Sequence, residues 1–184
     1  MSSKGSPRFK KQQLYQLFID GLGDMVEKHS DITKAPLLVD LKAPYPLRLR
    51  VYLYNCTNPP GGRSIEEYKS QVILPGQKPR ERGQLDYSDW RMPILAAYAL
   101  IGENIGDGVF VLWDAYKHDS FAYSANMQVR AETILKTLSS NVAVSRRSND
   151  EIVLAARPQH LFEAIRCRVS TLADDKKEAS HELI

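Results

Sequence analysis

The sequence lacks the features that mark membrane, secreted or metal-binding proteins. No stretch approaches the roughly 18 apolar residues of a membrane-spanning helix, and the N-terminus has no apolar signal segment. The two cysteines, Cys56 and Cys167, lie far apart and have no second ligand at metal spacing, which predicts two buried free thiols. These absences favour a cytoplasmic protein with no membrane partner and no bound metal.

The common catalytic signatures are also missing. The chain has no Walker A loop, no G-x-G-x-x-G fingerprint, no C-x-x-C or H-x-x-x-H pair and no G-x-S-x-G elbow. Its four histidines are scattered over predicted helix ends, a loop and the C-terminal tail. Nucleotide hydrolysis, Rossmann-type redox chemistry, zinc proteolysis and serine hydrolysis are therefore not indicated, and no cofactor is expected.

Charge is unevenly distributed along the chain. Residues 1–12 are basic without a single acid, residues 171–184 carry more acids than lysines, and the stretch between them is nearly neutral. We predict a disordered basic N-terminus over 1–11, one domain over 12–170 and a flexible C-terminal tail over 171–184. Nucleic-acid binding would have to rest on local clusters of basic residues, because bulk charge does not indicate it.

Hydrophobic periodicity predicts an α+β fold rich in short strands. A helix is expected over 12–29, weakened by Gly21 and Gly23, and two shorter helices over 131–138 and 158–169. Strands are expected over 36–41, 48–56, 67–74, 93–100, 109–114, 121–124 and 126–129, with a hairpin formed by 142–146 and 151–156. The strands follow one another too directly for repeated βαβ units, which favours a mostly antiparallel open β-barrel, or pseudobarrel, of about seven strands.

The strands Arg48–Cys56 and Glu67–Leu74 and the loop between them form the most distinctive stretch. This loop contains two prolines and two glycines and is longer than chain reversal requires. Proline restricts φ and glycine permits close backbone approach, so the loop is suited to present Arg63 to a partner. A second polar loop, Ala115–Ser120, follows another strand, and a basic polar segment follows Leu74.

These loops and the strands beside them supply side chains that could contact DNA. Arg and Lys bind phosphates and guanine, while Asn and Gln can read adenine. The candidate DNA-binding residues are Asn58, Arg63, Ser64, Lys69, Gln71, Lys78, Arg80, Arg82, Lys117, His118, Asn126 and Gln128.

Two alternatives stay open from the residues alone. Glu67-Tyr68-Lys69 has the E-x-K form of Mg²⁺-dependent nucleases, in which a second carboxylate, here Asp40 or Asp114, would complete the metal site. Magnesium would be a cofactor only under that hypothesis. The other alternative is a protein-interaction β-barrel in which the Pro-Gly loop contacts a partner chain.

The segments N-P-P-G-G-R-S-x-x-E-Y-K-x-Q, VFVLWDAYKH and S-A-N-M-Q-V resemble the B3-like specificity domains of bacterial restriction endonucleases. In that family two loops grip duplex DNA and enter its major groove. The resemblance, which covers about 36–170, implies that Asn55–Glu66 and Ala115–Ser120 are the two gripping loops. It also implies double-stranded DNA as a partner and a nuclease domain or subunit that would supply any chemistry. The N-terminal helix and the low overall charge depart from that pattern.

Overall fold

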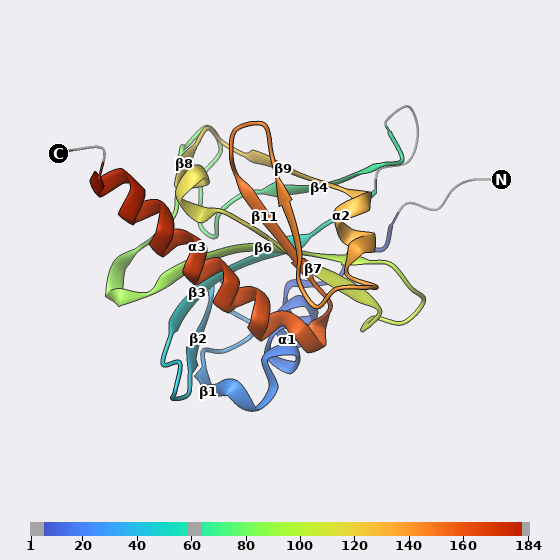
Figure 1. Ribbon diagram of the computed structural model, residues 1–184, viewed down its shortest axis with the longest axis horizontal. Helices are drawn as coiled ribbons and strands as arrows, with labels where there is room; N and C mark the ends of the chain where they lie inside the picture. The colour runs from blue at the N-terminus through green and yellow to red at the C-terminus, as the bar shows by residue number, and fades with distance from the viewer. Residues whose placement is uncertain (1–5, 59–63, 182–184) are drawn as a thin grey trace.

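A seven-stranded, mostly antiparallel sheet forms the centre of the molecule (Figure 1). The computed structural model describes residues 6–58 and 64–181, with side chains described as far as Leu172. The only parallel neighbours in this sheet are β3 and β6. In spatial order its strands are β1 (Val26–His29), β2 (Leu37–Leu41), β3 (Arg48–Asn55), β6 (Met92–Leu100), β7 (Gly108–Trp113), β11 (Ile152–Ala156) and β10 (Ala143–Arg146). In the described part of the chain β1 and β10 are the sheet edges, so the sheet stays open, and the predicted α+β class is confirmed.

Two smaller antiparallel pairs lie outside this sheet. Strand β4 (Glu67–Val72) pairs with β9 (Ala125–Arg130), and β5 (Gly83–Gln84) pairs with β8 (Ser120–Phe121). An isolated bridge between Thr57 and Lys69 connects the end of β3 to β4. We call the β4–β9 pair the ribbon, because it carries the candidate site.

Three α-helices and four single 3-10 turns complete the described chain. The helices are α1 (Lys11–Leu22), α2 (Ala131–Lys136) and α3 (Leu161–His181), and the turns are η1 (Gly23–Met25), η2 (Ser88–Trp90), η3 (Ala115–His118) and η4 (Pro158–His160). No helix in this part of the protein is long and apolar enough to span a membrane.

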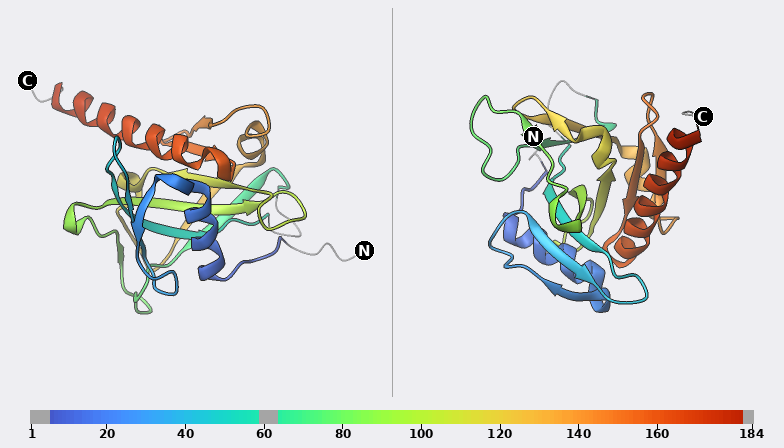
Figure 2. Two further views of the ribbon diagram at one scale, coloured as in Figure 1. Left: turned by 90° about the horizontal axis from the view of Figure 1, so that it is seen from below. Right: turned by 90° about the vertical axis from the view of Figure 1, so that its left-hand side faces the viewer.

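The central sheet is covered on both faces, which gives the molecule two apolar cores. On one face, Leu49, Val51 and Leu53 of β3 pack with apolar residues of α1 and α3. On the other face, Tyr52 packs with Trp113 and with the inner side of the ribbon. Figure 2 presents these layers from two further directions. Alternate residues of β3 therefore enter different cores, and because both faces are covered even Arg50 is only 5% exposed.

Arg50 is buried because it holds the segment that precedes β6. Its guanidinium lies 2.8 Å from the carboxylate of Asp86 and 3.2 Å from that of Asp89. Arg48 donates a hydrogen bond of 3.0 Å to the carbonyl of Asp89. The polar segment that follows Leu74 therefore contains a 3-10 turn, η2, which is bound to β3 through Arg48 and Arg50.

Several local predictions are wrong. The first helix ends at Leu22, where Gly23 adopts a positive φ of 52°, and the predicted last turn, 26–29, forms edge strand β1 instead. The last helix continues from its predicted end at 169 to His181. Cys56 is buried as expected, but Cys167 is exposed on α3.

Within the predicted disordered N-terminus, the described residues include two that contact the rest of the domain. Phe9 packs against the first core, and its backbone amide donates a 2.7 Å hydrogen bond to the side chain of Asn55. Lys11 begins α1, donates to the carbonyl of Leu53 and lies 4.1 Å from the ring centroid of Tyr54. This segment is therefore part of the domain.

Candidate nucleic-acid interface

The ribbon gathers predicted site residues from two distant parts of the sequence onto one solvent-facing surface. In the antiparallel register Lys69 lies opposite Gln128, and Gln71 lies opposite Asn126. Glu67 and Arg130 form the next pair toward the first loop. Since alternate residues of a strand point to the same side, these six side chains share one face, which we call the outer face.

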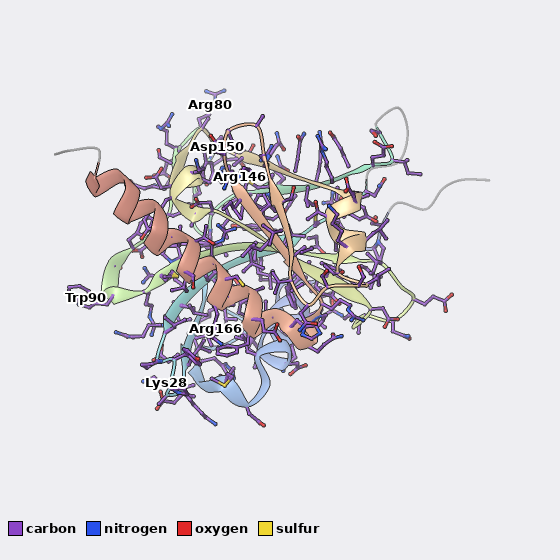
Figure 3. The ribbon with its side chains drawn as sticks, viewed as in Figure 1. Lys28, Arg80, Trp90, Arg146, Asp150 and Arg166 are labelled. Atoms are coloured by element: carbon purple, nitrogen blue, oxygen red, sulfur yellow. The ribbon has the colours of Figure 1, made fainter. Side chains whose placement is uncertain are left out.

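The inner face of the ribbon has the opposite character and fixes its position. Ser70, Val72, Met127 and Val129 are buried on this side. Below them the indole nitrogen of Trp113, on β7, donates a 3.1 Å hydrogen bond to the carbonyl of Gln128. Apolar packing on one face and polar exposure on the other make the ribbon a rigid platform for outward-facing polar groups. Figure 3 shows side chains that project from it, away from the central sheet.

The two loops predicted to grip DNA do not leave the sheet side by side. They follow β3 and β7, and these strands run in opposite directions because β3 is parallel to β6 while β6 is antiparallel to β7. The loops therefore leave opposite ends of the central sheet. Asn55–Glu66 leads into β4 at the Glu67–Arg130 end of the ribbon, and Ala115–Ser120 precedes β8 and the other end of β9.

Only the flanks of the first loop are described. Arg63, which this loop is predicted to present to a partner, lies outside the described residues. The side chain of Asn58 donates a 2.7 Å hydrogen bond to the carbonyl of Ile65, and the hydroxyl of Ser64 accepts one of 3.2 Å from the amide of Glu66. Asn58 and Ser64 thus order the two flanks of this loop.

The second loop is turn η3, which is fastened to the β10–β11 hairpin. Lys117 Nζ donates a 3.2 Å hydrogen bond to the carbonyl of Asn149 in the hairpin turn. Nε2 of His118 lies 2.7 Å from Oε1 of Glu151, a carboxylate with a fully buried side chain. The guanidinium of Arg147 lies 3.1 Å from the other oxygen of Glu151. His118 is therefore engaged in an internal ion-pair network.

The electrostatics of Glu151 follow from these partners. Burial by itself would raise the pKa of this carboxyl, but the hydrogen bond with His118 and the charges of His118 and Arg147 outweigh burial and lower it. Glu151 is therefore ionised at neutral pH, and its charge is balanced inside the protein.

The predicted basic cluster Lys78, Arg80 and Arg82 is exposed in the segment that follows the ribbon strand β4. Arg82 donates a 3.3 Å hydrogen bond to the hydroxyl of Ser120 at the start of β8. Arg80, labelled in Figure 3, adopts a positive φ of 66° and extends from the edge of the molecule. The three side chains are not on the outer face of the ribbon, although they follow directly on its β4 strand.

The carboxylates of the nuclease hypothesis have other surroundings. Glu67 and Lys69 share the outer face, but Asp114 is only 3% exposed and accepts a 2.9 Å hydrogen bond from the amide of Tyr116. Asp40, on β2, forms ion pairs with Lys28, Arg48 and Arg91. Among the described residues no group of three or more His, Cys, Asp or Glu side chains is placed to hold a metal ion.

Arg130 belongs to the outer face, yet the sequence analysis did not select it. It ends β9, immediately before α2, and it falls between the predicted strand 126–129 and the predicted helix 131–138. The alternation Asn126, Gln128, Arg130 was the available signal, because three polar residues at period two predict one solvent-facing side of a strand.

The sequence was compared with models of known protein families, and one of them matches. A family model described as methylase-associated X1 matches residues 47–165, more than half of the chain. The chain belongs to the methylase-associated X1 family. The match includes the whole ribbon, both predicted loops and the β10–β11 hairpin, whereas α1, β1 and β2 precede it. No curated protein and no solved structure matches the chain. The restriction-modification context inferred from the sequence is thereby supported.

Proposed function

We propose that this methylase-associated X1 domain recognises a short sequence in double-stranded DNA and that the ribbon reads the bases. The outer face carries the proposal. Its six side chains are all polar, they come from two segments more than fifty residues apart, and five of them are Lys, Arg, Asn or Gln, the residue types that commonly read bases. Gln and Asn can pair with adenine through two hydrogen bonds, and Lys and Arg can contact guanine.

The dimensions of the ribbon suit the major groove. Each strand has six residues and is therefore about 17 Å long, and paired strands lie about 5 Å apart. The major groove is about 12 Å wide and admits a two-stranded β-ribbon. An apolar inner face packed on Trp113 holds the ribbon rigid, which lowers the entropic cost of binding.

In this proposal the two loops of the B3-like resemblance take positions at the two ends of the ribbon. They would contact DNA on either side of the bases read by the outer face, and Lys78, Arg80 and Arg82 would add phosphate contacts beyond β4. The domain would recognise the DNA sequence. An associated methylase, of the kind that the family description implies, would carry out the reaction on the DNA. A nuclease subunit is not needed for this role.

A selection experiment tests the proposal. The purified protein is mixed with a randomised duplex pool at several salt concentrations, with and without Mg²⁺, and the retained DNA is sequenced. We expect an enriched short motif and intact DNA under both conditions. No retention even at about 50 mM salt would refute DNA recognition, because phosphate contacts are strong there. Shortened DNA only with Mg²⁺ would instead support the Glu67–Lys69 nuclease hypothesis.

Variants of the outer face make the test specific. Gln71→Ala and Asn126→Ala should each relax the enriched motif at one or two positions, since each base contact contributes roughly 1–3 kcal/mol of discrimination. Lys28→Gln is a matched control, because Lys28 is an exposed cation on edge strand β1, at the other side of the molecule in Figure 3. An unchanged motif in both ribbon variants would remove the ribbon from base recognition.

A further inference from the structure

A polar groove beside the ribbon has no role in the function proposed so far. It lies between β9 and the β10–β11 hairpin and has a volume of about 260 Å³. Arg130 lines it from the ribbon, and Ser145, Arg146, Arg147 and Ser148 line it from the hairpin. We call it the arginine groove. Three arginines and two serines from separate elements thus line one small space.

The donors of Arg130 and Arg146 are available to a ligand. In the part of the chain that the structure describes, no carboxylate lies within ion-pair distance of Arg130. Arg146 lies 3.5 Å from Asp150, and the two side chains are 64% and 79% exposed. A long, exposed pair of this kind contributes little, so an incoming anion can replace Asp150. Glu67 is the one carboxylate in the lining, and it is the direct cross-strand neighbour of Arg130.

Arg147 is held in place by the interior of the protein. Its guanidinium contacts buried Glu151 at 3.1 Å, and its backbone amide donates a 2.8 Å hydrogen bond to the Glu151 carbonyl. Glu151 is also held by His118 and accepts a 3.3 Å hydrogen bond from the amide of Asp114. Arginine has five donors, so its contact with Glu151 leaves others directed elsewhere.

The hairpin turn that carries these residues is fixed as well. The amide of Asp150 donates a 3.0 Å hydrogen bond to the carbonyl of Arg147, and Lys117 binds the carbonyl of Asn149 from η3. Figure 3 labels Arg146 and Asp150 next to the end of the hairpin. A binding group on a rigid, supported element keeps its geometry without a ligand, which favours a site over a solvated charged turn.

These observations point to a phosphate as the ligand. Guanidinium groups bind phosphate through two parallel hydrogen bonds, and serine hydroxyls add donors. We propose that the arginine groove binds a backbone phosphate of the same DNA whose bases contact the outer face. The inference rests on the function proposed above and adds to it. The ribbon reads sequence, and the groove fixes the register of the duplex on the ribbon.

The salt dependence of binding separates the two roles. Arg146→Gln should weaken binding to every duplex sequence by a similar factor, roughly tenfold. It should also lower the slope of log affinity against log salt by about 0.9 for the one lost phosphate contact. The enriched sequence motif should not change. Arg166→Gln is the control, because Arg166 is a guanidinium on α3, away from the ribbon, that stacks on the ring of Tyr45.

A neutral phosphate analogue provides the decisive experiment. Duplexes of the selected sequence that carry one methylphosphonate at successive backbone positions are tested against both proteins. One position should weaken binding of the unmodified protein but not of Arg146→Gln, since the same contact cannot be lost twice. Equal losses for both proteins at every position, or an unchanged salt slope, would overturn the groove proposal and leave base recognition by the ribbon standing. If the unmodified protein retains no duplex, both proposals fail.

Discussion

The central sheet and the ribbon obey different rules, although both are antiparallel for most of their length. Strand β7 is buried over all six of its residues, because it lies under the ribbon on one side and under the helices on the other. Strand β9 alternates, with Met127 and Val129 buried while Asn126 and Arg130 are exposed. A strand covered on both faces can only contribute packing. A strand covered on one face is held in place and still presents a surface to a partner.

The largest expected effect is a loss of stability on removing a buried side chain from the central sheet, which is covered on both faces. Phe110 is fully buried and packs edge-to-face on Phe18, with 5.6 Å between ring centroids. Phe110→Ala should lower the free energy of unfolding by about 4 kcal/mol, from lost burial and the cavity left behind. Gln71→Ala, on the outer face, should stay within about 0.5 kcal/mol. Urea titration measures both, and similar losses would contradict the contrast between the two regions.

The buried Glu151 network should give the next largest effect. Glu151→Gln removes the charge that His118 and Arg147 share, which should cost about 3 kcal/mol at neutral pH. The folded protein has the lower pKa at this carboxyl, so its contribution is complete above the ordinary value of 4.5 and is lost as pH falls through the lowered value. The stability difference between the two proteins should therefore shrink as the pH drops below 4.5. A difference that stays constant with pH would show that the charge of Glu151 is not involved.

The two faces of one ribbon strand can be compared directly. Val72→Asn places an amide in the buried inner face without a designed partner and should cost about 2 kcal/mol. Gln71→Val, on the adjacent outer position, should leave the unfolding free energy nearly unchanged but relax the sequence preference on DNA at one or two positions. Thermal unfolding measures the stability of both variants, and duplex competition measures their sequence preference. If Gln71→Val lowered stability as much as Val72→Asn, the assignment of the faces would be wrong.

The smallest expected effect is a difference in reactivity between the two cysteine thiols, one in the core under the ribbon and one on the surface. Cys56 follows β3 in the second core, and burial raises the pKa of its thiol to about 12. Cys167 is exposed on α3. Iodoacetamide at pH 8 should therefore alkylate one thiol in the native protein and both in urea, which intact mass can count. Modification of Cys56 under native conditions would mean that the core beneath the ribbon opens readily.

The sequence predicts the elements of this fold better than their partners. The positions of β3, β6, β7 and the β10–β11 hairpin follow from local patterns of apolar residues and turns, and the structure confirms them. The pairing of β4 with β9 could not be derived, because fifty-two residues that form other strands separate the two segments. Although β3 precedes β4 in the sequence, the described strand β4 pairs along its length with β9, and near β3 it forms a bridge with Thr57, two residues beyond the end of β3.

For the candidate site too, the residues could be predicted from the sequence but their arrangement in space could not. Lys69, Gln71, Asn126 and Gln128 were selected for their chemistry, and the register places them opposite one another in two pairs. The arginine groove was missed because Arg147 was interpreted as part of a hairpin turn. Nothing local indicates that this turn lies beside Arg130. Residue type predicted which groups could bind DNA, while their convergence depended on long-range packing.

The hydrogen bond from Trp113 to the ribbon gives the protein an internal optical probe. The chain contains two tryptophans: Trp113 is buried beneath Gln128, whereas Trp90 is 94% exposed on turn η2. Replacing Trp90 with Phe would leave a single indole, which contacts the inner face of the ribbon. Its emission wavelength would then report whether the ribbon stays seated on the sheet during titration, heating or ligand binding, with no added label.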